Sequence, residues 1–273
     1  MRTAIGRVLL YGALILGASA AILPMLWMVS ASLMPAGDAT TYPPRLFPRE
    51  VTFEHYRSVF TSLNMGRYLL NSTIVALTVT VISLFINSAA GYAFAKLRFR
   101  GRDRIFRLLG MGLVIPTQVA MLPLFLLMKQ LGLINSYGGV IIPTLASIFG
   151  IFLIRQYALA IPDDLLDAAR VDGASEFRIY RSVVLPVITP ILATLAIWTF
   201  LTTWNDFMWP LIVLSDDSKY TLPVALANLS GEHVQDTELM MAGSVMTVVP
   251  VLLVFLALQR YYIAGITGGA VKG

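Results

Sequence analysis

Six long apolar stretches dominate this sequence and restrict what it can fold into. Each has roughly the 20 residues that a helix needs to cross a bilayer. Because lipid offers no hydrogen-bond partners, such stretches must satisfy their backbone groups internally, as helices do. The chain is 57% hydrophobic and 13% charged, whereas soluble domains carry about 25% charged residues. The sequence therefore predicts an all-α integral membrane protein with six transmembrane helices, at about 8–33, 69–95, 105–128, 138–158, 185–213 and 241–263.

The first stretch begins like a secretory signal peptide. Arg2 and Arg7 precede an apolar run, and small residues follow at 18–20. The apolar run continues to Ala31, however, which is longer than the core of a signal peptide. We expect an uncleaved first transmembrane helix. With no soluble domain, linker or repeat in the pattern, residues 1–273 are expected to form one transmembrane domain.

Lysine and arginine predict the orientation of the chain, because cytoplasmic loops of membrane proteins are enriched in them. With the N-terminus inside, the larger group is cytoplasmic: Arg2, Arg7, Lys96, Arg98, Arg100, Arg102, Arg104, Arg107, Arg155, Arg170, Arg178, Arg181, Arg260 and Lys272. The smaller group faces outward: Arg45, Arg49, Arg57, Arg67, Lys129 and Lys219. Both termini are thus expected in the cytoplasm, and the loops at about 34–68 and 214–240 outside.

Composition also excludes several kinds of function. The pI of about 9.6 could suggest nucleic-acid binding, but the basic residues cluster at the ends of apolar stretches, as membrane orientation requires. The absence of cysteine excludes disulfides and thiolate chemistry. The two histidines, His55 and His233, are far apart in polar stretches, which argues against a metal or catalytic site. No GxxxxGK[ST] phosphate-binding loop is present, so the chain is not expected to bind ATP by itself.

One polar stretch, PDDLLDAARVDGASEFRIYRSVVLPVITP at 162–190, carries two helical patterns joined at a glycine. Pro162 suits a first helical position, and acidic residues follow it, where they favour the helix dipole. Gly173 is expected to end the helix in the left-handed conformation. Ser175 is expected to cap a second helix that carries Phe177, Tyr180 and Val184 on one side.

This stretch resembles the EAA loop of bacterial ABC importer permeases, in which E-A-A-x₃-G is followed further on by L-P, represented here by Asp167, Ala168, Ala169, Gly173, Leu185 and Pro186. Aspartate replaces the usual glutamate. We name residues of about 162–186 the EAA-like loop. In the family this loop sits in a cleft of the cytoplasmic ATPase subunit. The resemblance implies that contact for Asp167, Ala168, Ala169, Asp172, Gly173, Ala174 and Phe177.

Three further stretches resemble carbohydrate permeases of the maltose type. Residues 71–102 resemble the second span of that class. Three roles are open for the basic end of this stretch: it fixes the membrane topology, contacts anionic lipid, or contacts an ATPase surface. Trp204, Asn205 and Asp206 belong to a W-N-D-F pattern, for which either a structural role or a place in the sugar path or outer gate is open. The tail at about 264–273 resembles one that reaches the ATPase interface, implying roles for Gly268, Gly269, Lys272 and Gly273.

Together these resemblances imply the type I ABC importer permease fold and a bacterial inner-membrane location. They imply a heterodimer with a second permease, two ATPase subunits that bind ATP and Mg, an extracytoplasmic solute-binding protein, membrane lipid and a sugar substrate. The chain itself is expected to hold no cofactor, no metal and no catalytic site.

Two other classes of function remain open on the sequence alone. An ATP-independent secondary transporter or channel would need ion-coupling carboxylates or inverted repeats at mid-membrane. An intramembrane enzyme would need a catalytic pair within the bilayer. The apolar stretches hold essentially one acidic residue, Asp206.

Overall fold

A computed structural model of the chain describes residues 2–43, 45–232 and 236–270, and every regular element in these ranges is helical. The chain divides into two compact units, which are described separately: Met1–Leu69 with Val224–Pro250, and Leu70–Pro223 with Val251–Gly273. The expectation of one transmembrane domain stays a prediction.

The first unit contains α1 (Arg2–Ala31), α2 (Glu54–Thr61), most of α12 (Leu222–Glu232) and the first half of α13 (Thr237–Ala270). Ala31, Met34 and Ala39 form a small buried cluster against Trp27 and Met241. The apolar part of α1 is exposed along its length, as expected of a helix that faces lipid or another subunit.

Two buried polar side chains form hydrogen bonds between separate segments of this unit. Glu238 is buried and accepts a hydrogen bond from the backbone N–H of Ala39 at 2.7 Å. His55 was expected in a polar loop, but it is buried on α2, with Nε2 at 2.9 Å from the carbonyl oxygen of Met34. His233 lies outside the described residues.

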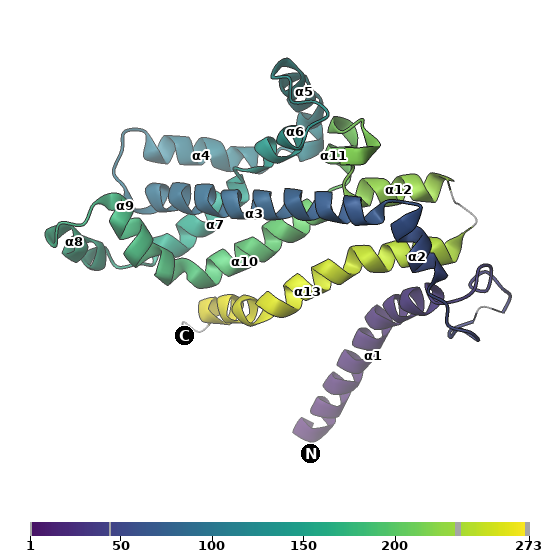
Figure 1. Cartoon of the computed structure of the whole chain (residues 1–273). Helices are drawn as coiled ribbons and strands as arrows, with labels where there is room; N and C mark the ends of the chain where they lie inside the picture. Colours follow the sequence, from purple (N-terminus) through teal and green to yellow (C-terminus); the bar gives the residue numbers. More distant parts are fainter. Residues whose placement is uncertain (1, 44, 233–235, 271–273) are drawn as a thin grey trace. The chain divides into compact units, whose positions relative to one another are not determined.

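The second unit is built on α3 (Met65–Lys96), which is followed by α4 to α7 (Figure 1). Their bounds are Arg102–Gly112, Thr117–Gln130, Tyr137–Ile141 and Ile148–Leu159, with a 3₁₀ turn at Ile142–Thr144. The chain then forms α8 (Asp163–Val171) and α9 (Glu176–Ile179). A π-turn at Tyr180–Val184 leads directly into α10 (Leu185–Trp204), and α11 (Met208–Val213) follows.

α3 and α7 cross at very short range. A Cβ atom on Gly91 would lie 2.6 Å from Cγ2 of Ile154 and 3.0 Å from the backbone nitrogen of Arg155. Membrane helices commonly use small residues for such approaches because packing between them depends on close contact. Gly91 makes this crossing possible because it has no side chain.

Hydropathy located the membrane-crossing helices well but missed interruptions within the expected spans. In the described part of the chain, five helices are long and apolar enough to cross a bilayer, or six if α4 and α5 form one span. The expected third span is bent by 105° between α4 and α5. Pro116 explains the break, since it lies at φ −59° and ψ 131°, outside the helical region, immediately before α5.

The expected fifth span, 185–213, is not one helix either. α10 ends at Trp204 and α11 begins at Met208, so Asn205 and Asp206 lie in the break between the two helices. At its other end this span is longer than predicted, because the π-turn joins α9 to α10 and the apolar helix runs from Glu176 to Trp204.

Candidate functional site

The EAA-like loop folds as two helices around a glycine turn, as the sequence predicts. The N–H of Ala174 donates to the carbonyl of Ala169, and the N–H of Gly173 donates to that of Arg170, both at 3.0 Å. With Gly173 at φ +79°, this is a Schellman ending to α8. The Ser175 hydroxyl caps α9 by accepting the N–H of Arg178 at 3.4 Å. Pro162 lies one residue before α8 rather than in it.

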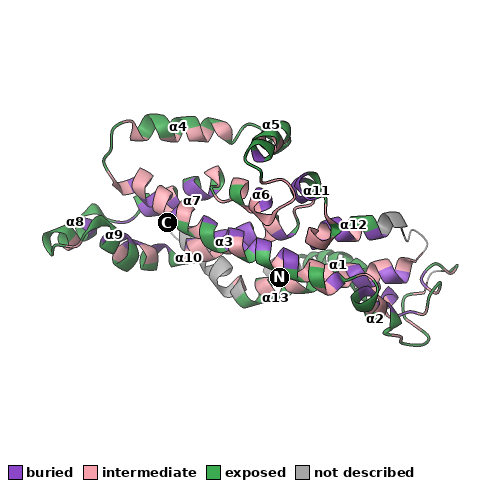
Figure 2. Ribbon diagram, turned by 45° about the horizontal axis from the view of Figure 1, so that its top comes forward, coloured by how far each residue is buried: buried purple, intermediate pink, exposed green. Residues whose placement is uncertain are grey.

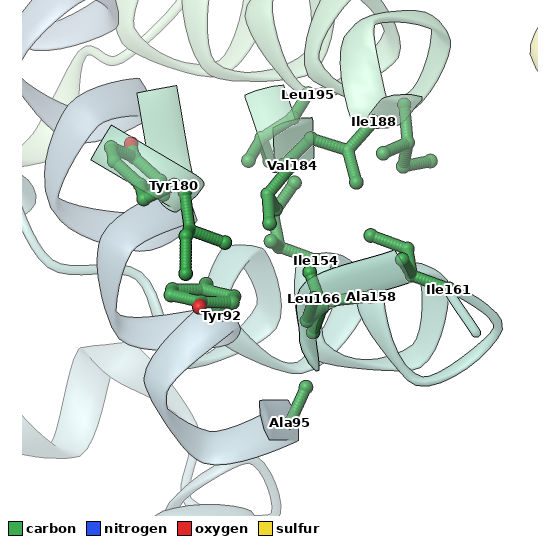
Figure 3. Close-up of a cluster of buried hydrophobic side chains, with 12 residues drawn as sticks. Tyr92, Ala95, Ile154, Ala158, Ile161, Leu166, Tyr180, Val184, Ile188 and Leu195 are labelled. Carbon is green, nitrogen blue, oxygen red and sulfur yellow. The ribbon is translucent and has the colours of Figure 1, made fainter. Parts of the chain in front are cut away.

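Leu166 anchors the loop to the rest of the second unit. Its side chain is 1% exposed and belongs to a buried cluster with Ile154, Ile179, Tyr180 and Val184 (Figure 3). The cluster draws on α3, α7, α8, α9 and α10. One side of α8 is therefore fixed to the helices that continue into the apolar part of the chain.

A chain of polar contacts fastens the two loop helices to each other and to α3. Arg170 donates to Asp167 Oδ1 at 2.6 Å and to Glu176 Oε1 at 2.8 Å. Glu176 Oε2 accepts the hydroxyl of Tyr92 at 2.8 Å. The hydrogen bonds with Glu176 and Asp167 raise the pKa of Arg170 above its already high value. We name Asp167, Arg170, Glu176 and Tyr92 the loop strap.

Lys96, the last residue of α3, holds the start of α8. Its ammonium group donates to the carbonyl of Ile161 at 2.6 Å and to Asp163 Oδ1 at 2.7 Å. The hydrogen bond and charge of Lys96 lower the pKa of the Asp163 carboxyl. Sequence reasoning considered topology, anionic lipid and an ATPase surface for the basic end that begins at Lys96, but it found neither the contact of Lys96 with α8 nor the loop strap. The i,i+3 spacing of Asp167 and Arg170 was a visible signal, whereas the contact of Arg170 with Glu176 depends on the turn between them.

The opposite side of the loop is exposed and partly apolar (Figure 2). Val171 is 87% exposed, Phe177 63% and Leu165 46%. Asp167, Ala168, Asp172 and Gly173 are also exposed, while Ala169 and Ala174 are half-buried. Phe177 lies beside Tyr180, as expected of residues on one side of this segment, but it is not buried with Tyr180 and Val184. The rings of Phe177 and Tyr180 are in contact at 6.2 Å, but only Tyr180 and Val184 are buried.

Trp204, Asn205 and Asp206 come together at the break between α10 and α11. Trp204 is buried and stacks on Phe200, with ring centroids 5.5 Å apart. The Asn205 amide donates to the carbonyl of Leu201 at 2.8 Å. Asp206 Oδ1 accepts the N–H of Trp209 at 3.4 Å, near the start of α11. These contacts give the W-N-D-F pattern a local structural role, and its place in a sugar path stays a prediction.

The tail residues are only partly within the described structure. Gly268 and Gly269 belong to the last turn of α13, which extends to Ala270. Lys272 and Gly273 lie outside the described residues. Their proposed contact with an ATPase stays a prediction.

Comparison with known proteins gives one consistent result. The family described as "Binding-protein-dependent transport system inner membrane component" matches residues 87–267. The arabinooligosaccharides transport system permease protein AraQ of Halalkalibacterium halodurans is 40% identical over 256 residues, which cover 93% of this chain and 92% of AraQ. The lactose transport system permease protein LacG of Rhizobium radiobacter is 32% identical, with coverage of 98% and 97%.

Among solved structures, the chain matches one from a bacterial ABC transporter involved in the import of the acidic polysaccharide alginate. The TM-score is 0.85 at 26% identity, and the match covers 95% of this chain and 97% of that one. This similarity confirms the predicted type I ABC importer permease fold. The chain belongs to the family of inner-membrane components of binding-protein-dependent transport systems, and it is a multi-pass membrane permease.

Proposed function

We propose that this chain is one of the two permease subunits of an ATP-driven importer for a sugar or oligosaccharide. The observation that carries the proposal is the two-sided construction of the EAA-like loop. Leu166 fixes one side to the helical core, while Val171, Phe177 and Leu165 present apolar surface on the other. Exposed apolar side chains beside polar ones are typical of a surface that binds another protein.

The proposed occupant of this surface is a cytoplasmic ATPase subunit. The chain lacks a phosphate-binding loop motif, so ATP and Mg would be bound by that partner. Ala168 and Gly173 have little side chain, which lets a partner backbone approach closely. The tail, including Lys272 and Gly273, would add a second contact at the ATPase interface.

The EAA-like loop is connected directly to two of the long apolar helices, α3 and α10. α9 joins α10 through the π-turn, and the loop strap connects α8 and α9 to α3. A displacement of the loop would therefore be passed to α3 and α10 together. This is how closure of the ATPases would change which side of the membrane the path is open to, as a coupling energy between nucleotide and substrate states.

The relatives support a carbohydrate as substrate. AraQ is a permease for arabinooligosaccharides and LacG for lactose, and the structurally similar transporter imports alginate. The remaining parts of the proposal are a second, different permease subunit, an extracytoplasmic binding protein at the outer loops, and both termini in the cytoplasm. Trp204, Asn205 and Asp206 are proposed as part of the outer end of the path.

The test uses the complex isolated through a tag on this chain and reconstituted in liposomes. Uptake of an oligosaccharide mixture and ATP hydrolysis are measured for wild type, Gly173→Asp and Gly173→Asn. A Cβ at position 173 would meet nothing within 4 Å, so neither substitution causes a clash within the chain. Each variant can act only through backbone strain at φ +79° and through its contact with the ATPase subunit. Asparagine tolerates this conformation several-fold better than most residues.

We expect Gly173→Asn to retain coupling and Gly173→Asp to lose ATP-dependent uptake, because the charge enters the proposed contact with the ATPase. Uptake that continues without ATP and depends on an ion gradient would overturn the proposal in favour of a secondary transporter. Full activity of Gly173→Asp would remove the loop from the coupling path.

A further inference from the structure

The turn between α3 and α4 contains a hollow that the proposed function does not use. Its volume is about 890 Å³. The residues that line it are Arg98, Phe99, Arg100, Gly101, Arg102, Asp103, Arg104 and Arg107, which we name the arginine hollow. Five arginines thus face one aspartate, an excess of four positive charges in one concave site.

The single carboxylate of the arginine hollow neutralises little of this charge. Asp103 Oδ1 accepts from Nε of Arg102 at 3.0 Å. Arg107 donates to the backbone carbonyl of Asp103 at 3.3 Å, which leaves its charge uncompensated. Within the described part of the chain, Arg98, Arg100 and Arg104 have no ion pair with a carboxylate. Guanidinium groups suit phosphate especially well, because they can bind its oxygens in pairs.

Adjacent contacts keep this basic turn in a defined place. Phe94 contacts both Phe99 and Phe106, with ring centroids 5.7 and 5.5 Å apart. Phe106 in turn stacks on Phe152 of α7, and the guanidinium of Arg155 lies 4.0 Å from the Phe106 ring centroid. Aromatic packing thus holds the start of α4 against α3 and α7.

The surroundings of the arginine hollow indicate which phosphate it would meet. The apolar helix α3 ends at Lys96, just before the hollow, and the apolar residues that begin at Leu108 follow directly after it. On α4 the side chain of Ile105, next to Arg104, is exposed, and so are those of Leu108 and Met111, about one and two turns further on. A molecule with an anionic head and aliphatic chains would satisfy both surfaces at once.

We propose that the arginine hollow binds the phosphate of an anionic phospholipid, whose acyl chains lie along the exposed apolar side chains of α4. Basic recesses at the cytoplasmic ends of membrane helices bind such headgroups in general. A bound phospholipid is more than a consequence of membrane orientation, because orientation requires positive charge in the loop but does not require a concave site. It is also separate from the proposed docking of an ATPase at the EAA-like loop.

The test measures lipid retention by the full chain in detergent, using native mass spectrometry with phosphatidylglycerol and phosphatidylcholine of equal acyl chains. Wild type is compared with R100Q/R104Q/R107Q. The matched control is R49Q/R57Q/R67Q, which removes the same charge from three exposed arginines elsewhere. Arg104→Gln alone serves as the mildest variant, because Arg104 makes no hydrogen bond within the described residues.

We expect wild type to retain phosphatidylglycerol in preference to phosphatidylcholine. R100Q/R104Q/R107Q should lower that retention by about tenfold or more, and Arg104→Gln by about threefold. The control triple variant should stay close to wild type. Phosphatidylglycerol should persist in millimolar inorganic phosphate.

Equal retention by wild type and both hollow variants would overturn the proposal. Displacement of the lipid by inorganic phosphate would also overturn it, by showing a site for free phosphate. If the hollow variants kept their lipid but lost a co-purifying acidic subunit, the occupant would be a protein. None of these lipid measurements depends on sugar uptake. A failure of the lipid proposal can therefore be distinguished from a failure of the proposed transport function.

Discussion

Leu166 and Leu165 are neighbours on α8 with opposite surroundings, and they allow a sharp test of how the EAA-like loop is held. Leu166 is 1% exposed within the buried cluster, whereas Leu165 is 46% exposed. The same substitution, leucine to alanine, removes the same atoms from the same helix at both positions. Any difference between the two variants therefore reports on tertiary packing.

The expected magnitude follows from burial. Removing a fully buried leucine side chain costs about 2 kcal/mol or more, from lost transfer free energy and the residual cavity. α8 lies outside the apolar spans, so Leu166 would be transferred to water when the loop detaches. Local opening of α8 should then become about 30-fold more frequent in Leu166→Ala. Leu165→Ala should change it by about twofold or less, as surface substitutions do.

Hydrogen–deuterium exchange of the backbone amides in 163–176 measures this opening directly. We expect faster exchange in Leu166→Ala, confined to the EAA-like loop, with α10 unchanged. In the reconstituted complex, Leu166→Ala should uncouple ATP hydrolysis from uptake, while Leu165→Ala should weaken attachment of the ATPase. Equal exchange in the two variants would refute the anchoring role of Leu166.

Two further predictions concern the ion pair at the start of α8 and the crossing of α3 with α7. Because Lys96 lowers the pKa of Asp163, their ion pair contributes above the unfolded aspartate pKa of about 3.9. It is lost as pH falls through the lowered folded value, so the protection of the α8 amides relative to their intrinsic exchange rate at each pH should be constant from neutral pH down to about 5 and fall only in stronger acid. Gly91→Ala should destabilise the chain by about 1–3 kcal/mol through overpacking against Ile154, measured as thermal stability in detergent. Gly110→Ala is the control, because a Cβ there meets nothing within 4 Å and should be neutral or stabilising; equal effects would contradict the close crossing.

Local sequence signals predicted the EAA-like loop well. Gly173 ends α8 in the left-handed conformation and Ser175 caps α9, both as expected. Each feature depends on a few adjacent residues, so no knowledge of the tertiary fold was needed. The exposure of Phe177 could not be predicted in this way, because helical spacing gives the side of a helix but not how far neighbouring elements cover it.

The two breaks in the spans were missed because hydropathy does not register helix ends inside apolar sequence. Apolar residues at 113–115 continue from α4 into the bend. α11 is apolar again after Asn205 and Asp206, so hydropathy read over the length of a span passed across the two polar residues at this break. Pro116 was visible as a possible kink, but a proline in a membrane helix does not by itself predict a bend as sharp as 105°.

The loop strap illustrates what lies beyond a single sequence. Tyr92 and Glu176 are separated by 84 positions, and nothing local in either segment marks them as partners. Their contact nevertheless gives the EAA-like loop a second attachment, on α3, beside its direct continuation into α10. A loop attached only to α10 could swing without moving α3. Because Arg170 and Glu176 join both loop helices to Tyr92, we expect a partner that pulls on the exposed side of the loop to move α3 and α10 together.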